Sequence, residues 1–440
     1  MPEPEPAPAS APTAAPSALP APPEQCDVLV VGAGPAGSAC AQWLARAGWR
    51  VVLVEQQVFP RDKICGDGLI PDAHHALQRL GVQAEVMAQA QSVAHVACIG
   101  PRGGRVDVPG RLAVLPRKQL DDILKRAAER AGAQFFAPWR FEAPVLEGDL
   151  VVGAHLSCQA EPGKTGDQPR LATVHARWVV LATGAIPKAL QAAQVCLRQQ
   201  PTGVALRGYI HHPAMADQIR AMEVVWHKRL SKGYGWIFPC RDGLFNIGVG
   251  LAHSHRALAN SDGRSRGQMQ DVNLREMFKA FTEVHAPAAA LLAGGHWQSP
   301  LKGAPLRCSL DGALFGRPGL LVTGEAAGST YAFTGEGIGK AMETGLMAAE
   351  SLLAGQAASE PEAATRARYE ARVMALKPRF DLYERANRVN EHPWLADLVI
   401  WRARNSPRIL RRMAGVLEET DNPGRLVSVR GITKLFLPIR

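Results

Sequence analysis

A glycine-rich turn between two short apolar runs constrains this chain more than any other feature. Residues 26–31 predict a strand, and the sequence GAGPAG follows at Gly32–Gly37. A helical pattern covers residues 35–47, and a second apolar run at 50–54 ends at Glu55. A strand, a glycine turn, a helix and a second strand within about thirty residues predict a βαβ unit of the dinucleotide-binding kind.

The glycines of this unit each have a physical purpose. Gly32 permits the tight turn after the strand, Gly34 lets the backbone approach a pyrophosphate, and Gly37 lets the helix pack close to the strand. The first helical turn, with Pro35 and Ala36, directs unpaired N–H groups at the phosphates. We therefore expect all five residues to bind the cofactor.

Glu55 gives the unit its selectivity. Its carboxylate can accept hydrogen bonds from a ribose diol and would repel a 2′-phosphate. The unit is therefore not built for NADP.

A second glycine-rich junction lies almost three hundred residues further along the chain. Residues 319–323 predict a strand, and a helix is expected over residues 339–353. A nicotinamide dehydrogenase has no need of this junction, whereas an FAD protein uses it to close over the ribityl chain and the flavin ring. The helix N-terminus would direct its dipole at the N1/C2=O edge of the flavin, which becomes anionic on reduction. We therefore predict bound FAD, with contacts from Gly324, Glu325, Gly335, Glu336, Gly337 and Ile338.

The fold class expected from these patterns is α/β. Residues 1–24, almost entirely Pro, Ala, Ser and Glu, predict a disordered leader. Residues 25–190 and 300–355 form the predicted Rossmann-type FAD-binding domain. Residues 191–299 predict an interleaved antiparallel-sheet substrate domain, and residues 356–440 a helical C-terminal region.

The net charge of +10 is concentrated near the end of the chain. Residues 362–440 hold 16 Lys and Arg against nine Asp and Glu. A short basic amphipathic helix is expected at 407–417, preceded by Trp394 and Trp401. Two interpretations remain open: peripheral contact with a membrane surface, or docking against the parent domain. No apolar run of about 18 residues predicts a membrane-spanning helix.

Other composition features exclude further classes. The eight cysteines lack metal-ligand or CxxC spacing, so neither a metal site nor a disulfide framework is expected. Nucleic-acid binding is not expected, because no recognisable module accompanies the positive charge. The oligomeric state is left open.

Three further stretches carry a family resemblance together with the first βαβ unit. Lys63–Gly68 reads KICGDG and looks like a Lys-x-Cys-Gly-Gly-Gly segment. Tyr234–Pro239 reads YGWIFP and matches a Tyr-x-Trp-x-Phe-Pro motif. Gly324–Gly345 is similar to a Gly-Asp-Ala-Ala-Gly…Thr-Gly-Glu-Gly-Ile segment. On these motifs, residues 26–353 resemble the geranylgeranyl reductase family of FAD-dependent oxidoreductases, in the para-hydroxybenzoate-hydroxylase-like superfamily.

The resemblance implies roles for particular residues. Cys65 and Gly66 would lie near the flavin edge, and Arg117, followed by Asp121 on an expected helix, would border the flavin. An apolar tunnel for an isoprenoid chain would be shaped by Tyr234, Trp236, Phe238 and Pro239. Packing alone offers alternatives: Cys65 as a small buried hydrophobe, and Tyr234 and Trp236 as sheet core.

The implied activity is an FAD-dependent reductase that hydrogenates carbon–carbon double bonds of a geranylgeranyl-type chain. NAD(P)H or a ferredoxin-like protein would supply electrons, and a lipid substrate would place the enzyme in the cytoplasm at the inner membrane face. Three residues are candidates for the catalytic proton donor, and the sequence does not choose among them: Cys65, Asp67 and Tyr234.

The rival interpretation is an FAD-dependent monooxygenase or halogenase of the same superfamily. A halogenase would be expected to have Trp where Tyr234 stands, and a hydroxylase Asp-Gly in place of Thr183-Gly184. Other departures from the reductase pattern are Asp67 and Glu325, which replace Gly and Asp, and Ala332, which replaces Pro.

Overall fold

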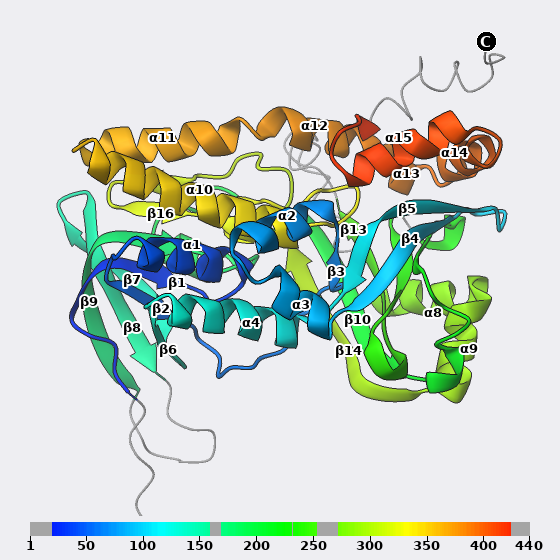
Figure 1. Cartoon of the computed structure of the whole chain (residues 1–440), viewed down its shortest axis with the longest axis horizontal. Coiled ribbons are helices and arrows are strands. Elements are labelled where there is room, and N and C mark those ends of the chain that lie inside the picture. Colours follow the sequence, from blue (N-terminus) through cyan, green and yellow to red (C-terminus); the bar gives the residue numbers. More distant parts are fainter. Residues whose placement is uncertain (1–19, 159–168, 231, 253–271, 424–440) are drawn as a thin grey trace, which may run out of the picture.

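The computed structural model of this chain describes residues 20–158, 169–230, 232–252 and 272–423 (Figure 1). Most of the expected leader and the last 17 residues of the expected C-terminal region lie outside the described residues. The described part is a mixed α/β fold built on two eight-stranded sheets, as the sequence predicts.

The first sheet contains the predicted βαβ unit. Its central strand β1 pairs in parallel with β2 on one side and β9 on the other. These strands are continuous apolar runs because helices and sheet cover both of their faces. The strand order is β15-β16-β9-β1-β2-β6, and β9 extends into an antiparallel ribbon with β8 and β7. The strands are β1 (Gln25–Val31), β2 (Val51–Val54), β6 (Gln134–Phe136), β7 (Arg140–Glu147), β8 (Leu150–Cys158), β9 (Arg170–Leu181), β15 (Gly316–Arg317) and β16 (Leu320–Val322).

Helices cover the first sheet and join it to the second. In Figure 1, α10 lies above α1, α11 lies above α10, and α4 lies beside the sheet. The predicted helices at 35–47 and 339–353 are confirmed with shifted ends, and so is the expected helix that carries Arg117 and Asp121. The helices are α1 (Pro35–Arg46), α2 (Pro71–Arg79), α3 (Gln83–Gln89), α4 (Arg117–Arg130), α5 (Lys188–Ala192) and α10 (Ile338–Ala357).

The second sheet runs in the order β14-β10-β13-β12-β11-β4-β5-β3. Its pairs are antiparallel except β11 with β4, and α8 and α9 pack beside it (Figure 1). The strands are β3 (Gly68–Leu69), β4 (Gln91–Ile99), β5 (Arg105–Val114), β10 (Gly203–His211), β11 (Met222–Val225), β12 (Tyr234–Pro239), β13 (Leu244–Ala252) and β14 (His296–Leu306); the helices are α8 (Leu274–Val284) and α9 (Ala286–Gly294).

The structure divides the chain differently from the expected boundaries. Strands β3 to β5, within the range expected for the FAD domain, belong to the second sheet. They join the rest of that sheet where β4 pairs in parallel with β11, at Val96 and Met222. At the other edge, β14 extends the second sheet to residue 306. Strand pairing across more than 120 residues leaves no local pattern, so the sequence could not reveal this exchange.

The C-terminal helices spread across both halves of the molecule. Helix α11 (Glu362–Met374) runs along α10, and α12 (Lys377–Ala386) and α13 (Arg388–Glu391) lead to α14 (Trp394–Arg404) and α15 (Pro407–Leu417) above β4 and β5 (Figure 1). Ile409 and Val416 of α15 are buried, so docking on the parent domain accounts for its apolar face. Trp394 and Trp401 remain 57% and 52% exposed.

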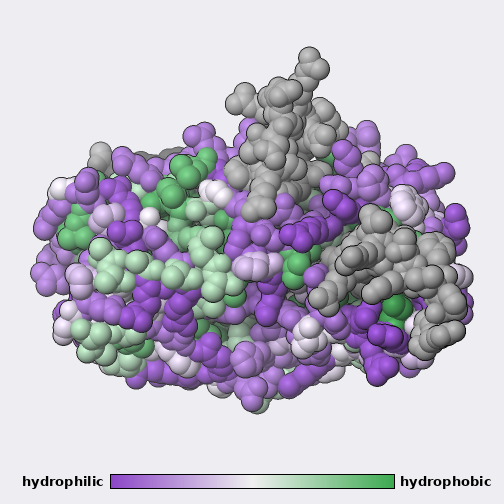
Figure 2. Space-filling view, turned by 90° about the horizontal axis from the view of Figure 1, so that it is seen from above, coloured by the Kyte–Doolittle hydropathy of each residue, from purple (hydrophilic) through white to green (hydrophobic). Residues whose placement is uncertain are grey.

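Where it is not covered by grey residues, the surface seen from above is mainly hydrophilic, with apolar patches between (Figure 2). In the described ranges, no helix is both long and apolar enough to cross a membrane.

Candidate functional site

The first glycine turn has the geometry that its sequence requires. Gly32 adopts a φ of +102°, and a Cβ there would lie 2.4 Å from the Ala182 carbonyl oxygen. A Cβ on Gly37 would lie 1.8 Å from the Gly32 oxygen. Around Gly34, by contrast, the nearest neighbours of a Cβ are the guanidinium ends of Arg61 and Arg117, at 3.6 and 3.8 Å. The turn therefore presents an open backbone surface facing two cations, which suits a pyrophosphate.

A chain of charged groups borders this turn. Arg61 lies between Glu55, at 3.3 Å, and Asp121, at 2.9 Å. Arg117 binds Asp121 through two hydrogen bonds of 2.6 and 2.8 Å. Glu55 also accepts a hydrogen bond from the Ala33 amide at 3.2 Å. The sequence analysis did not identify Arg61 as a site residue. The sequence offers only one indication of its role, a basic residue in the loop after Glu55.

The second glycine junction lies against the first. A Cβ on Gly324, whose φ is +68°, would meet the Ala36 side chain at 2.6 Å, and Gly345 of α10 packs on the Ala36 backbone. Helix α10 begins after Gly337 with no side-chain cap, as α1 begins after Gly34. Two uncapped helix N-termini therefore converge from segments almost three hundred residues apart, and both favour negative charge.

A cavity of about 770 Å³ runs past both junctions. It continues along the aromatic strand β12 and ends beneath α13, α14 and α15. Gly37 and Gly324 support the site by packing rather than by facing the cavity, and Pro239 is buried outside the cavity lining. The predicted site residues that line it are Gly32, Gly34, Pro35, Ala36, Glu55, Cys65, Gly66, Asp67, Arg117, Tyr234, Trp236, Phe238, Glu325, Gly335, Glu336, Gly337 and Ile338.

An aromatic row forms one wall of this cavity. Neighbouring ring centroids are 6.3 Å apart for Trp226 and Tyr234, 6.2 Å for Tyr234 and Trp236, and 6.4 Å for Trp236 and Phe238. Trp226 was missed because it follows β11, outside the recognised motif. The far end is apolar, with side chains from the C-terminal helices: Val389, Ala396, Val399, Ile400, Met413 and Leu417.

Asp67 anchors the segment beneath the cavity floor. It adopts a φ of +65°, which explains the glycine found there in the family pattern. Its fully buried carboxylate accepts hydrogen bonds from the Tyr209 hydroxyl, from Asn246 at 2.6 Å and from the Arg117 amide at 3.2 Å. Burial raises the pKa of Asp67 to about 6, although the nearby Arg207 charge opposes this shift.

Cys65 and Tyr234 both face the cavity with their polar atoms engaged. The Cys65 sulfur accepts a 3.4 Å hydrogen bond from the Asp67 amide, and burial raises the pKa of the thiol. The Tyr234 hydroxyl donates to the Thr334 carbonyl at 2.6 Å. Burial, and next the charge of Glu336, raise the pKa of Tyr234.

These features fit FAD. Glu55 would bind the adenosine ribose, and the Gly34 turn with Arg61 and Arg117 would bind the pyrophosphate. Glu325 and the α10 N-terminus would hold the ribityl chain and the flavin edge. The buried Thr183 hydroxyl has no hydrogen-bond partner among the residues that the structure describes and lines the same cavity, so it remains available to a ligand.

Comparison with known proteins agrees with this arrangement. A family model described as an FAD binding domain matches residues 25–227. A menaquinone reductase of Mycolicibacterium smegmatis is 32% identical over 350 residues, which is 75% of this chain and 77% of that protein. The chain belongs to the geranylgeranyl reductase family of FAD-dependent oxidoreductases.

Further relatives of this flavoenzyme include a digeranylgeranylglycerophospholipid reductase of Methanosarcina acetivorans, 27% identical over 336 residues and covering 74% of each chain. A solved geranylgeranyl bacteriochlorophyll reductase-like protein of Thermoplasma acidophilum aligns with a TM-score of 0.66 at 22% identity, over 94% of this chain and 96% of that one. A flavin-dependent brominase aligns with a TM-score of 0.63 at 20% identity, over 88% and 93%. At these identities the two structures show the fold alone.

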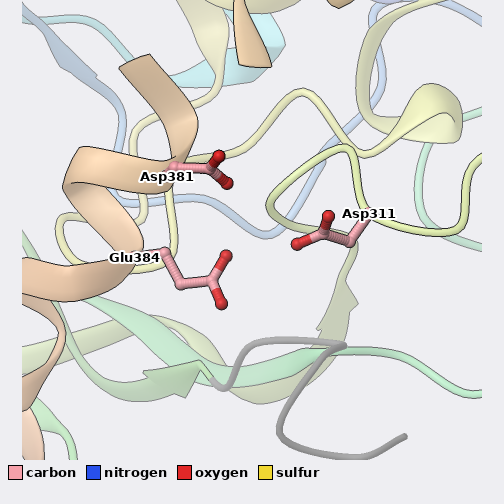
Figure 3. A group of neighbouring side chains, drawn as sticks. All are labelled: Asp311, Asp381 and Glu384. Carbon is pink, nitrogen blue, oxygen red and sulfur yellow. The ribbon is translucent and has the colours of Figure 1, made fainter. Parts of the chain in front are cut away.

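A second acidic group lies apart from the cavity. Asp311, Asp381 and Glu384 of the flavoenzyme turn their carboxylates toward one another (Figure 3). Lys377 pairs with both aspartates, at 2.9 Å from Asp311. Because the Lys377 ammonium already pairs with two of the three carboxylates, the group gives no ground for a metal site.

Proposed function

We propose that this flavoenzyme reduces carbon–carbon double bonds in an isoprenoid chain. The observation that carries the proposal is the continuous cavity from the two FAD junctions to an apolar end beneath α14 and α15. A long apolar molecule could occupy the far end while one of its double bonds lies at the flavin. The two relatives named above support this substrate class, because a menaquinone and a digeranylgeranylglycerophospholipid both carry isoprenoid chains.

The protein contributes position and a dry pocket to this reaction. Bound FAD would supply the hydride, and the remaining steps depend on side chains. The aromatic row from Trp226 to Phe238 offers flat apolar surface on which an alkene can be oriented. Asp67 and Asn246 hold the Cys65–Gly68 segment against this wall, since the Asn246 amide donates to both Asp67 and the Cys65 carbonyl, at 2.6 and 2.7 Å.

The proposal includes partners that the sequence also indicated. NAD(P)H or a ferredoxin-like protein would reduce the flavin. Contact of α14 with the inner face of a membrane would bring a lipid substrate close to the cavity, because Trp394 and Trp401 are exposed beside the exposed arginines 404, 408 and 411.

The experiment is mass spectrometry of a geranylgeranylated lipid after incubation in air with the purified yellow protein and an electron donor. Gain of two hydrogens per reduced double bond, without oxygen, is the expected result. Incorporation of oxygen or halogen would refute the reductase proposal and favour the monooxygenase or halogenase alternative. Heat-denatured protein and a fully saturated lipid are the matched controls.

A further inference from the structure

A cluster of acidic groups surrounds Lys340 at the start of α10. The Lys340 ammonium lies 3.9 Å from Asp72 and 2.9 Å from Glu419 and also pairs with Glu343. Arg379 pairs with Glu419 as well. We call these residues, together with Glu336, the Lys340 cluster.

The Lys340 cluster holds more carboxylates than cations. The charges of Asp72, Glu419 and Lys340 all act on Glu336. Four carboxyl groups therefore share two cations within the described part of the chain, and Lys340 itself is only 2% exposed. Full ionisation would leave two more negative than positive charges around the buried Lys340 ammonium, so retained protons stabilise the cluster.

Glu336 is the member of the cluster that reaches the cavity. It lies between Gly335 and Gly337 in the loop that leads into α10, is half-buried, and belongs to the cavity lining, whereas Asp72 does not. The Asp72 carboxylate lies behind it, against the backbone of Gly339: a Cβ on that glycine would be 2.3 Å away. Burial, and next the charge of Glu336, raise the pKa of the Tyr234 and Tyr383 hydroxyls.

The protonation of these acids follows from their surroundings. Burial, and next the charge of Asp72, raise the pKa of Glu336 to about 8. Burial likewise raises the pKa of Asp72 to about 7, although the Lys340 charge opposes this shift. An acid that is protonated at neutral pH and faces a cavity is suited to proton donation.

We infer that Glu336 supplies the proton in the proposed reduction, and that the Lys340 cluster stores it. This inference rests on the proposed function. Bound reduced FAD would supply the hydride, and the Glu336 carboxylic acid would supply the proton. The alkene would lose one π bond and gain two C–H bonds, the flavin would be oxidised, and the Glu336 carboxylate would regain a proton through the cluster.

The three donors considered from the sequence are less well placed for this step. The Asp67 carboxylate is fully buried and accepts three hydrogen bonds. The Tyr234 hydroxyl hydrogen is directed at the Thr334 carbonyl. The pKa of the Cys65 thiol is raised by burial, which makes it a weaker acid than a carboxyl group.

The first test compares Glu336→Gln with Glu350→Gln in the flavin-loaded protein. Glu350 lies on α10, pairs with Arg79 and Arg372, and is outside the cavity lining. FAD occupancy and the rate of flavin reduction by the donor are measured in both variants, so that the next step is compared per reduced flavin. Oxidation of the reduced flavin by the prenylated lipid, followed anaerobically, should slow about 100-fold or more in Glu336→Gln only. A rate within about threefold of wild type would overturn the inference.

The second test measures thermal unfolding of the flavin-free protein between pH 5 and 9. A carboxyl group with a pKa near 4.5 unfolded and about 8 folded binds more protons in the fold, so stability falls as pH rises through this window. The fall in stability between pH 5 and 9 should be smaller in Glu336→Gln than in the wild-type protein, and unchanged in Glu350→Gln. If the stability of Glu336→Gln depended on pH as that of the wild-type protein does, the inference that Glu336 holds a proton would be refuted.

Failure of the proposed function looks different from failure of this inference. If the wild-type protein adds oxygen rather than hydrogen, the reductase proposal and the donor role are both overturned. If the wild-type protein adds hydrogen and Glu336→Gln does so equally fast, only the donor role is overturned.

Discussion

Asn390 links the C-terminal region to both walls of the cavity. Its Oδ1 accepts the Trp226 indole N–H at 2.7 Å, and its amide donates to the Phe333 carbonyl at 3.0 Å and to Asn387 at 2.8 Å. Phe333 belongs to the loop before Gly335, and Trp226 begins the aromatic row. Asn390 is fully buried, so Asn390→Leu would remove these hydrogen bonds while keeping the number and branching of the side-chain heavy atoms.

The cost can be worked from those bonds. The substitution leaves the Trp226 donor and the Asn387 acceptor buried without partners, at about 1–3 kcal/mol each. The added apolar burial of Leu offsets about 1 kcal/mol. A net loss of about 1–5 kcal/mol is expected. At about 2.1 cal/mol/K per residue, the unfolding entropy of this chain is about 0.9 kcal/mol/K, so the Tm should fall by about 1–5 °C.

The assay is thermal unfolding of the FAD-bound protein, together with the FAD dissociation constant. We expect weaker FAD binding as well, because the Phe333 carbonyl loses its anchor. Adding Trp226→Phe to Asn390→Leu should cost less than the two single changes combined, with a coupling of about 1 kcal/mol. Asn405→Leu is the control: its side chain makes one solvent-exposed hydrogen bond, to the Trp401 carbonyl, so the loss of stability should stay below about 1 kcal/mol. An unchanged Tm and FAD affinity in Asn390→Leu would refute the linking role.

Three further predictions concern the cofactor turn and the outer surface. Gly37→Ala should yield colourless protein without FAD, because the new Cβ would lie 1.8 Å from a carbonyl oxygen. Gly48→Ala is the control, since a Cβ there has no neighbour within 4 Å. It should stay yellow and lose about 1–2 kcal/mol of folding stability, because Gly48 has a φ of +84°. Arg61→Met should weaken FAD binding about tenfold or more in a fluorescence titration, and an unchanged affinity would contradict a pyrophosphate contact. Trp394→Ser with Trp401→Ser should reduce cosedimentation with anionic vesicles at unchanged Tm, whereas equal cosedimentation would remove the case for membrane contact.

The local elements could be predicted because their causes are local. The Gly32–Gly37 turn, the helix that carries Arg117 and Asp121, and the second glycine junction all appear where periodicity and glycine placement predict them. The fold class, FAD and the enzyme family were predicted correctly. The individual catalytic and substrate roles remain predictions. Pro239 shares the motif of the cavity-lining aromatic residues but lies outside the lining, because a sequence motif does not specify which of its residues face a cavity.

The sequence by itself determined the FAD-binding scaffold of this protein. Glycine spacing and apolar runs act through backbone sterics and burial within a few residues, so they can be recognised along the chain. The tertiary structure alone decided which strands share a sheet, that α14 and α15 close the apolar end of the cavity, and that Asp72 and Glu419 surround Lys340 beside Glu336. Those arrangements depend on contacts between segments up to 295 residues apart, and such contacts leave no periodic trace in either segment.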